Sequence, residues 1–524
     1  MTLLEGESPR AAVRRHAYNN FVTVAGLLAT LAAVSLAGCG SSDDSDAGAG
    51  AGGKSNGGAG NSGGSHAGGS QAGGSHAGGD QAGGGDSAAG DSNGGGDSEG
   101  GDLNGGAPNI GEAGASGEGG GRAAVSPTQQ SLDHVFVITL ENKSFTDTFG
   151  TSKQDPYLKQ LATKGAILTE YYGTGHVSLD NYVAMMSGQP STLETQSDCF
   201  QGFNDVTAAG SDATNPKVIK TADGKGCVYP TAVKTFPNQL DDLNLTWKGY
   251  MGDMGNDPTR ESATCGHPAI STIDHTQAAQ APSVDVPAGD QYASRHDPFV
   301  YFHSIIDNQA YCDSHVVNLD AKLQNDLKAI ETTPNFVFIT PNLCDDGHDG
   351  DGTGAAGKGC VNGAPGGLAS IDAFLTKWIP LIQASPAYQK DGLIIINFDE
   401  SGDTSVAGSS TDTGTGITTY TLNLPGQACC GQQTGPNVTR PGDAILPASA
   451  TLHYDLHYIG VGGDRTGAVL LSKWIAPGTV SYTPYNHYSL LRSLENIFQT
   501  NGYLGYADDA NLVTFGDDVF TNLK

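Results

Sequence analysis

Three clusters of acidic and amide side chains are the groups best suited to chemistry in this sequence. Each cluster directly follows a run of apolar residues. They read Glu141-Asn142, Asp345-Asp346-Gly347-His348-Asp349 and Asp399-Glu400-Ser401. Carboxylate and amide oxygens together with an imidazole suit Mg²⁺, Mn²⁺, Ca²⁺ or Zn²⁺. The clusters therefore predict a divalent-cation site, and the sequence leaves the identity of the cation open.

A candidate nucleophile lies in the glycine-flanked segment Gly173-Thr174-Gly175-His176-Val177-Ser178. This segment precedes a helical stretch that begins near Asp180, so Ser178 is expected close to a helix N-terminus. Backbone N–H groups at such an end point toward a bound anion. A serine hydroxyl activated by a nearby cation is a group that attacks phosphorus in line, and we therefore predict cleavage of a phosphate ester.

Each of these patterns taken alone has a simpler interpretation. An acidic pair after a strand is commonly a helix cap or a solvated turn. Residues 345–350 resemble a calcium loop, although they lack the EF-hand spacing and its terminal Glu. His176 and His303 are each compatible with an ordinary, partly buried histidine. The prediction of a catalytic site therefore depends on the joint occurrence of these residues.

The elements that must position the clusters are three continuous apolar runs, at residues 134–140, 335–340 and 393–398. Such runs are typical of strands that are buried on both faces. Amphipathic stretches with a helical period lie at residues 157–164, 319–331, 371–384 and 489–498.

Buried strands that alternate with helices predict an α/β fold with a mostly parallel central sheet and helices on both faces. Ligands of open α/β sheets bind beyond the carboxyl ends of the strands. Because each polar cluster follows a strand, we expect the three clusters to converge on one site.

The N-terminal region predicts export. Arg10, Arg14 and Arg15 precede an apolar run at residues 21–36, which is short for a transmembrane span. The run ends in Leu36-Ala37-Gly38-Cys39, which resembles the bacterial lipobox, in which the cysteine becomes the acylated first residue. We therefore predict a lipoprotein signal peptide at residues 1–38, a lipid anchor on Cys39 and a bacterial protein facing the periplasm or the cell surface. An ordinary signal peptide is the alternative.

A tether is predicted between the anchor and the folded part. The chain has 76 glycines, and most of the excess lies before residue 124. Residues 39–126 consist mainly of Gly, Ala, Ser, Asp and Asn and include the repeat GGSHAGGSQA at 63–72. This composition cannot bury a core, so we predict a disordered linker at 39–126 and a catalytic domain at 127–524.

Charge and cysteine content narrow the possible partners. The formal net charge of −30 argues against a nucleic-acid-binding surface and against attraction of anionic lipid by a basic field, so the membrane contact is expected through the anchor only. Apart from Cys39, eight cysteines remain, and an even number in an exported chain indicates disulfides, with buried free thiols as the alternative. Cys344 and Cys360 would close a short loop, whereas Cys429 and Cys430 are expected to bond to different partners.

Together, these segments resemble the phosphoesterase family that includes bacterial and fungal acid phosphatases and phosphocholine-type phospholipases C, within the alkaline-phosphatase-like superfamily. The matching segments keep the family order over roughly residues 131–500. They are Glu141-Asn142-Lys143-Ser144-Phe145, His176-Val177-Ser178-Leu179-Asp180-Asn181-Tyr182, Trp247-Lys248-Gly249-Tyr250-Met251, His296-Asp297-Pro298-Phe299-Val300-Tyr301-Phe302, Thr340-Pro341-Asn342, Asp346-Gly347-His348-Asp349, Phe398-Asp399-Glu400 and Asn486-His487-Tyr488-Ser489-Leu490-Leu491.

The resemblance implies an alkaline-phosphatase-like α/β core with one catalytic divalent metal ion. The implied metal ligands are Glu141, Asn142, Ser178, Asp399 and Glu400, and Ser178 is also the implied nucleophile that forms a phosphoseryl intermediate. The residues implied to contact phosphate or to protonate the leaving group are His348 and His303. Further substrate-binding candidates are His176, Asp346, Asp349 and His487, the last of which has helix capping as an alternative role.

The departures from the family pattern guide the choice of substrate. In the phospholipase C branch, a Gly-rich turn and an Asp-His pair usually follow the Asp-Glu pair, whereas Ser401-Gly402-Asp403-Thr404 follows here. Residues 247–251 and 346–349 resemble the acid phosphatase branch more closely. We therefore expect a phosphomonoesterase acting on a small phosphate ester. A phospholipase C acting on a phosphocholine-type head group and a non-catalytic surface lipoprotein are the alternatives.

Overall fold

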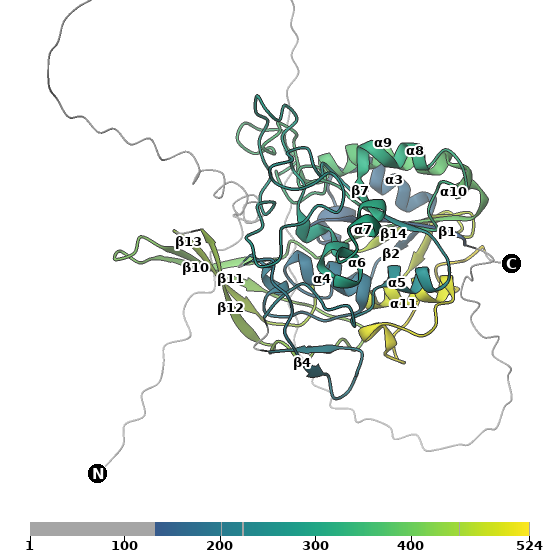
Figure 1. The fold of residues 1–524 in the computed structure, drawn as a ribbon. Helices are drawn as coiled ribbons and strands as arrows, with labels where there is room; N and C mark the ends of the chain where they lie inside the picture. Colours follow the sequence, from purple (N-terminus) through teal and green to yellow (C-terminus); the bar gives the residue numbers. More distant parts are fainter. Residues whose placement is uncertain (1–131, 201, 223–224, 450, 523–524) are drawn as a thin grey trace, which may run out of the picture. The chain divides into compact units, whose positions relative to one another are not determined.

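The computed structural model describes residues 132–200, 202–222, 225–449 and 451–522. A sheet of eight strands, in the order β15-β2-β14-β9-β1-β8-β6-β7, forms the core of this part, and Figure 1 shows helices packed around it. The predicted signal peptide at 1–38, the anchor Cys39 and the linker at 39–126 lie outside the described residues.

Three neighbouring parallel strands form the middle of the sheet. They are β1 (His134–Leu140), β8 (Phe336–Thr340) and β9 (Gly392–Phe398), and every residue in them is buried. β1 lies between the other two, with Val135 opposite both Phe336 and Leu393. The three strands predicted from continuous apolar runs are thus confirmed, with ends that differ by a residue or so.

The outer strands make the sheet mixed but mostly parallel. Beyond β8, β6 (Trp247–Met251) and β7 (Val316–Asn318) continue in parallel. Beyond β9, β14 (Ala468–Ser472) runs antiparallel to β9 and to β2 (Ala166–Leu168), and β15 (Thr479–Ser481) pairs in parallel with β2. The predicted α/β fold with a mostly parallel central sheet is therefore confirmed.

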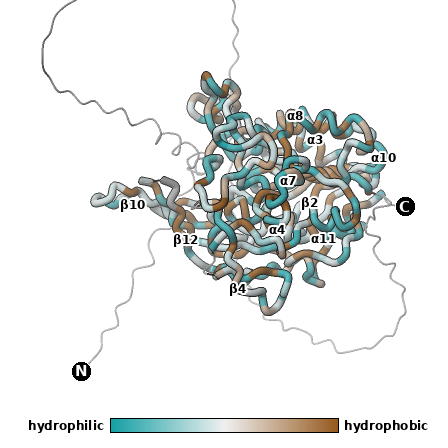
Figure 2. The backbone as a smooth tube through the Cα atoms, in the orientation of Figure 1, coloured by the Kyte–Doolittle hydropathy of each residue, from teal (hydrophilic) through white to brown (hydrophobic). Residues whose placement is uncertain are grey.

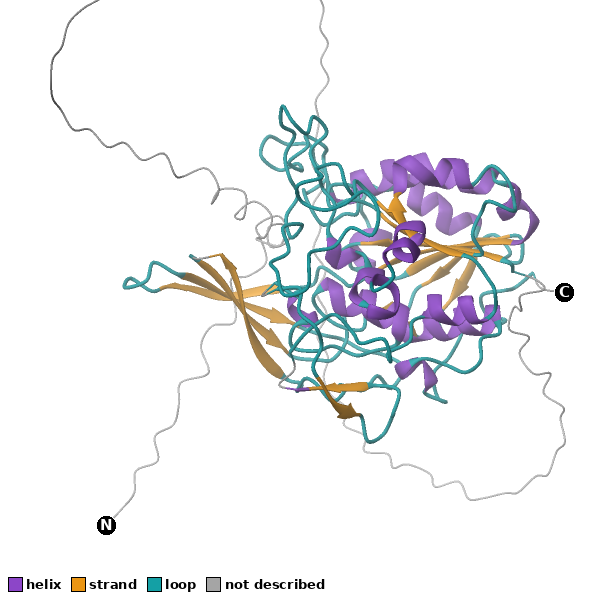
Figure 3. Cartoon of the chain, in the orientation of Figure 1, coloured by secondary structure: helices purple, strands orange, loops and turns teal. Residues whose placement is uncertain are grey.

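Helices cover both faces of this sheet, as Figure 3 shows. Successive side chains of a strand point to opposite faces, so Phe136 and Ile138 pack on one side while Val135 and Val137 pack on the other. The first side carries α3 (Pro156–Lys164), α8 (Leu319–Asp326), α9 (Gly367–Ala384) and α10 (Pro386–Asp391). The second side carries α4 (Ser178–Ser187), α5 (Phe236–Asp242) and α11 (His487–Phe498), and Figure 2 shows hydrophobic residues gathered along the strands between the two layers.

Short elements complete this part of the chain. The remaining helices are α2 (Phe145–Phe149), α6 (His303–Ile306) and α7 (Gln309–His315), and the remaining 3₁₀ turns are Thr195–Ser197, Ser294–His296, Pro298–Tyr301 and Gly505–Asp508. The strand pairs outside the main sheet are β3 (Tyr171–Tyr172) with β16 (Tyr485–Asn486) and β4 (Ala208–Ser211) with β5 (Ile219–Thr221).

A second sheet, which no pattern in the sequence predicted, is inserted between β9 and β14. Its strands are β10 (Ser405–Thr411), β11 (Thr418–Leu424), β12 (Gly442–Ser449) and β13 (Leu452–Tyr458), in the order β10-β11-β13-β12. Leu422, Tyr454 and Leu456 belong to its own small core. The Tyr458 hydroxyl donates to the Gln196 carbonyl at 2.6 Å, which attaches the base of this inserted sheet to the main body.

Four disulfides join the eight cysteines of the described residues, in the pairs Cys199–Cys227, Cys265–Cys312, Cys344–Cys360 and Cys429–Cys430. The predicted loop between Cys344 and Cys360 is confirmed. The expectation that Cys429 and Cys430 bond to different partners is wrong. The other six cysteines form three disulfides among themselves, and the adjacent Cys429 and Cys430 are bonded to each other.

Across the residues that the structure describes, no helix is both long enough and apolar enough to cross a membrane.

Glu495 in α11 yields a prediction on stability. Burial raises the pKa of this carboxyl to about 8 from an ordinary value of 4.5. Its Oε1 accepts the Leu504 N–H at 2.8 Å, while its Oε2 and the nearby Gln239 Oε1 have no partner among the described residues. The folded state therefore keeps the Glu495 proton to a higher pH than the unfolded state does. The stability that protonated Glu495 contributes is present below pH 4.5 and is lost as the pH rises toward 8.

Glu495→Gln stays neutral at every pH and can donate to Gln239. We expect its melting temperature to exceed that of the wild type by a few degrees at pH 9 and to match it near pH 4.5, measured by calorimetry. Glu331→Gln at an exposed position is the matched control and should follow the wild type throughout. A Glu495→Gln protein whose difference from the wild type is the same at both pH values would contradict this account.

Candidate active site

The carboxyl ends of the three central strands bring the three polar clusters together. Glu141 follows β1, Asp399 follows β9, and the loop after β8 leads to Asp346. The Glu141 N–H donates to the Asp346 carbonyl at 2.8 Å, and the Asp399 N–H donates to the Leu140 carbonyl at 2.9 Å. These backbone bonds tie the clusters to one edge of the sheet, where ligands of α/β sheets bind.

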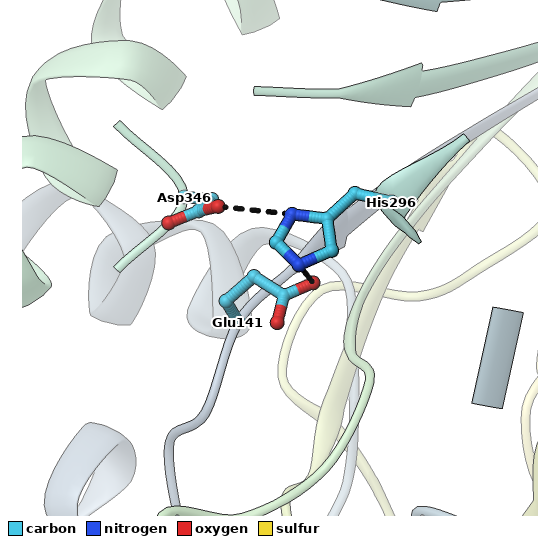
Figure 4. A group of neighbouring side chains, drawn as sticks. All are labelled: Glu141, His296 and Asp346. Atoms are coloured by element: carbon cyan, nitrogen blue, oxygen red, sulfur yellow. Dashed lines mark ion pairs between the residues drawn. The ribbon is translucent and has the colours of Figure 1, made fainter. Parts of the chain in front are cut away.

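Glu141, His296 and Asp346 form a buried cluster whose ligand atoms all lie within 4.8 Å of one another. In Figure 4 the His296 ring lies between the two carboxylates, with Nε2 3.5 Å from Glu141 Oε1 and Nδ1 3.4 Å from Asp346 Oδ2. Neither ring nitrogen of His296, nor Asp346 Oδ2, has a hydrogen-bond partner among the described residues. Buried polar atoms are normally paired, so these three atoms are available as ligands for a bound ion.

Electrostatics point in the same direction. Burial raises the pKa of Glu141 well above its ordinary value, and repulsion from Asp399 and Asp346 adds to the shift. Burial likewise raises the pKa of Asp346. Burial and the nearby Arg295 lower the pKa of His296 well below its ordinary value, so the imidazole is held neutral, as metal ligation requires. A divalent cation would offset the repulsion between the carboxylates, and the oxygen and nitrogen donors fit such an ion.

Asp399 and Asn142 border this cluster. The Asn142 N–H donates to Asp399 Oδ1 at 3.0 Å, and the Asn142 side chain donates to Glu141 Oε2 at 2.9 Å. Asn142 has a φ of 54°, a left-handed conformation that asparagine tolerates better than most residues and that allows both contacts. Asp399 is fully buried, and its Oδ2 has no partner within the described part of the chain. The predicted ligands Glu141, Asn142 and Asp399 are thus brought together.

Ser178 is the first residue of α4, as the sequence suggested for a residue near a helix N-terminus. Its Oγ donates to Glu141 Oε2 at 3.0 Å. Burial raises the pKa of Asp399, and a hydrogen bond from Ser178 partly offsets this rise. One turn further along α4, the Tyr182 hydroxyl donates to Glu141 Oε1, and its ring stacks on His296 with centroids 5.4 Å apart. The candidate nucleophile therefore lies directly against the carboxylate cluster.

Glu400 and His176 contact each other, although they were predicted as a metal ligand and a substrate-binding residue. Glu400 Oε2 hydrogen-bonds to His176 Nδ1, and His176 Nε2 lies 2.8 Å from Asp464 Oδ2. All three side chains are buried. Because both ring nitrogens of His176 are taken by carboxylates, the structure does not present this ring to a substrate.

His348 and Asp349 lie beside the cluster, in the loop that the Cys344–Cys360 disulfide closes. The His348 N–H donates to Asp346 Oδ1 at 2.8 Å, and its Nδ1 lies 2.7 Å from Asp349 Oδ1. The His348 side chain keeps 18% of its surface exposed, in contrast to the buried His296. Of the predicted histidines, His348 therefore combines contact with the cluster and access to solvent.

His303 and His487 are placed differently. On α6, His303 Nδ1 lies 2.7 Å from Asp307 Oδ1 and its Nε2 lies 2.9 Å from Asp205 Oδ1, so its ring is bonded to surface carboxylates and, among the described residues, not to the cluster. His487 is buried, with Nε2 2.5 Å from the Asp399 carbonyl, and burial lowers its pKa to about 4. It supports the backbone of Asp399, whereas Asn486 caps α11 by accepting the Ser489 N–H, so the capping role considered for His487 is wrong.

His296, Tyr182 and Arg295 are site residues that the sequence did not predict. His296 and Tyr182 both stood within family-like segments, but neither follows a strand, so the strand-end argument could not select them. Arg295 is a buried cation whose Nε lies 3.5 Å from Asp198 Oδ2, and Asp198 in turn accepts the Leu179 N–H next to Ser178. Its only sequence signal was its position beside His296.

The fold and the site define an α/β protein with a candidate metal centre and an adjoining serine at the carboxyl edge of its sheet. Residues 151–501 match the Phosphoesterase family, and the chain belongs to this family. It is 26% identical over 274 residues to the phosphate-repressible acid phosphatase of Penicillium chrysogenum, and the aligned region covers 52% of this chain and 49% of that protein. It is 23% identical over 272 residues to an acid phosphatase of Aspergillus fumigatus, and this alignment covers 52% of this chain and 45% of that protein.

The chain thus spans about half the length of the curated relatives it matches. Among solved structures, a protein of the alkaline phosphatase superfamily from Vibrio parahaemolyticus aligns with a TM-score of 0.34 and 11% identity, covering 70% of this chain and 67% of that one.

Because the carboxylates of the cluster repel one another, we expect Asp346→Asn to raise the thermal stability of the metal-free protein but to reduce its stabilisation by cation. Asp346→Asn removes one of the repelling carboxylates, so we expect the metal-stripped variant to melt at a higher temperature than the metal-stripped wild type. Adding Mg²⁺, Mn²⁺, Ca²⁺ or Zn²⁺ should stabilise the wild type, by about 2.7 kcal/mol at a hundred times the Kd of the preferred ion, and the variant much less.

Asp297→Asn is the matched control, because Asp297 is a buried acid next to His296 whose oxygens accept from the Tyr292 hydroxyl and the Phe299 N–H. It should retain the full stabilisation by cation. An Asp346→Asn protein that gains as much from cation as the wild type does would rule out Asp346 as a ligand.

Proposed function

We propose that this chain is a metal-dependent phosphoesterase, and specifically a phosphomonoesterase of the acid phosphatase type that works through Ser178. The observation that carries the proposal is the 3.0 Å contact between Ser178 Oγ and Glu141 Oε2, at the border of the orphaned ligand atoms of His296 and Asp346. Membership of the Phosphoesterase family and the acid phosphatase names of two relatives support the same reaction class.

The cation would be held by Glu141 and Asp399, with Asp346, His296, Asn142 and Ser178 as the adjoining donors and Glu400 as a further ligand. When bound, it would neutralise charge on the phosphate oxygens and lower the pKa of the serine hydroxyl. Glu141 Oε2 accepts the Ser178 hydrogen bond and fixes the direction of its Oγ, while Tyr182 fixes the other carboxylate oxygen.

The reaction then consists of two displacements at phosphorus. The Ser178 oxygen forms a bond to phosphorus as the ester P–O bond breaks, which releases an alcohol and leaves a phosphoserine. Water next attacks this phosphoserine, which frees inorganic phosphate and restores the hydroxyl. We assign the protonation of the leaving alcohol to His348, because it is the partly exposed histidine next to the cluster, and Asp349 holds its ring.

Phospholipase C activity is the weaker alternative for this site. A choline head group would need exposed aromatic faces. Tyr171, Tyr172 and Trp247, which are aromatic residues of or next to the family-like segments, are all buried, and Trp247 packs between Phe299 and His315. A non-catalytic surface lipoprotein would have no need for unpaired buried ligand atoms next to a serine.

The cellular setting belongs to the same proposal. We infer an exported bacterial lipoprotein, held at the membrane through Cys39 and the linker at 39–126, that acts on phosphate esters outside the cytoplasm. The lipobox-like residues before Cys39 and the eight paired cysteines support this setting.

Ser178→Ala tests the nucleophile. We expect kcat for p-nitrophenyl phosphate to fall by on the order of a thousandfold or more, with the melting temperature close to that of the wild type. Ser187→Ala is the matched control, because Ser187 is a buried serine of the same helix whose hydroxyl donates to the Val183 carbonyl. It should keep wild-type kcat, and a Ser178→Ala enzyme with wild-type turnover would refute the assignment.

Two chromogenic substrates separate the functional alternatives. We expect kcat/KM for p-nitrophenyl phosphate to exceed that for p-nitrophenyl phosphorylcholine, and EDTA to abolish both activities until cation is returned. A preference for the phosphorylcholine diester would replace our proposal by the phospholipase C. Activity that EDTA leaves unchanged would refute metal dependence, and absence of activity on both substrates would favour the non-catalytic alternative.

A further inference from the structure

Three segments that are distant in the sequence meet at the ring of His176. The ring belongs to the loop that leads into Ser178, and it lies between Glu400, which follows Asp399, and Asp464, which follows the inserted sheet. All three side chains are nearly free of solvent. The proposed phosphoryl transfer uses His176 for no step, although it is a buried histidine that two carboxylates hold.

The carboxylate of Asp464 is itself fixed from several sides. Its oxygens accept the N–H groups of Gly426 and Gln427, which belong to the turn after β11. Its backbone carbonyl accepts the Gly173 N–H at 3.0 Å. Asp464 is therefore a rigid anchor for the ring of His176, and it connects the inserted sheet to the loop that carries the nucleophile.

Glu400 has fewer fixed contacts than Asp464. Its carboxylate is hydrogen-bonded to His176, with Oε2 next to Nδ1. Its backbone packs closely against Gly173, where an added Cβ would lie 2.6 Å from the Asp399 carbonyl and 3.1 Å from Glu400 Cα. The loop at 173–178 thus touches both acidic residues that follow β9, and the ring of His176 sets the direction of the second one.

We propose that His176 is a positioning residue that holds Glu400 beside Asp399 and so fixes the geometry of the cation site and of Ser178. This inference rests on the proposed function, because it assumes that Asp399 and Glu400 face a cation. A carboxylate that a neighbour holds in one orientation loses less side-chain freedom on binding an ion than a free one does. Loss of such supporting partners typically lowers metal affinity or activity by about 10- to 100-fold.

The test measures cation affinity as well as turnover. His176→Ala and Asp464→Asn would be stripped of metal and titrated with the cation that elemental analysis finds in the purified wild-type protein, with a competing fluorescent chelator as the reporter. His134→Ala is the matched control. His134 is a buried histidine 2.9 Å from Asp391, at the amino end of β1 and thus at the opposite end of the strand from Glu141.

We expect the Kd for the cation to rise about 10- to 100-fold in His176→Ala. The rise should be smaller in Asp464→Asn, because asparagine has nearly the same shape as aspartate. Saturating cation should restore much of the lost kcat for p-nitrophenyl phosphate. The His134→Ala protein should lose thermal stability but keep the wild-type Kd. Asp464→Asn decides the question if His176→Ala does not fold.

The outcomes separate this inference from the function on which it rests. A wild-type protein that binds no divalent cation would overturn the proposed metal centre. A wild-type protein that binds the cation, together with variants at His176 and Asp464 whose Kd is unchanged, would overturn only the positioning role. A rise in Kd that is equally large in His134→Ala would show that loss of stability, and not the orientation of Glu400, is the cause.

Discussion

The burial of three carboxylates at one edge of the sheet is the constraint on which the rest of this structure depends. Burial raises the pKa of Glu141, Asp346 and Asp399, and within the described part of the chain no lysine or arginine is hydrogen-bonded to them, although Lys143 and Arg295 are close enough to interact with them electrostatically. Such an arrangement opposes folding unless the charges are neutralised. The divalent cation of the proposed function would offset this repulsion, so that a site unfavourable for folding without metal would become favourable with it.

The sheet keeps these groups in place despite their repulsion. β1, β8 and β9 are buried on both faces, and their parallel pairing fixes the three strand ends relative to one another. Two hydrophobic clusters on opposite faces hold the helices against these strands. The free energy of this packing permits unfavourable electrostatics at the edge, as is common where proteins bind ions or substrates.

Neutral and hydrogen-bonding groups then orient the charged ones. Tyr182 and Ser178 both donate to Glu141, Asn142 donates to Asp399 and Glu141, and His487 supports the backbone of Asp399. His176 links Glu400 to Asp464 and through it to the inserted sheet. The loop that carries Ser178 and the acidic strand ends are thus parts of one connected hydrogen-bond network, in which each bond limits the movement of the next.

The sequence alone determined the parts of this protein that depend on local pattern. Continuous apolar runs predicted the three central strands, because a strand buried on both faces has no polar alternation. Polar residues after those runs predicted where Glu141, Asp346 and Asp399 would meet, because parallel strands share a carboxyl edge. The short spacing of Cys344 and Cys360 likewise predicted their bond. These inferences use only the period of a strand and the direction of the chain.

The tertiary structure decided everything that depends on contacts between distant segments. His296 ends the 3₁₀ turn Ser294–His296 and does not follow a strand, so only the tertiary structure shows that it lies between Glu141 and Asp346. The sequence placed His176 and Glu400 among the candidate site residues, and only the tertiary structure shows that His176 bonds to both Glu400 and Asp464. The inserted sheet and the Cys429–Cys430 bond were also not predicted. Side-chain pairing is set by packing in three dimensions, and the sequence carries no local signal for it.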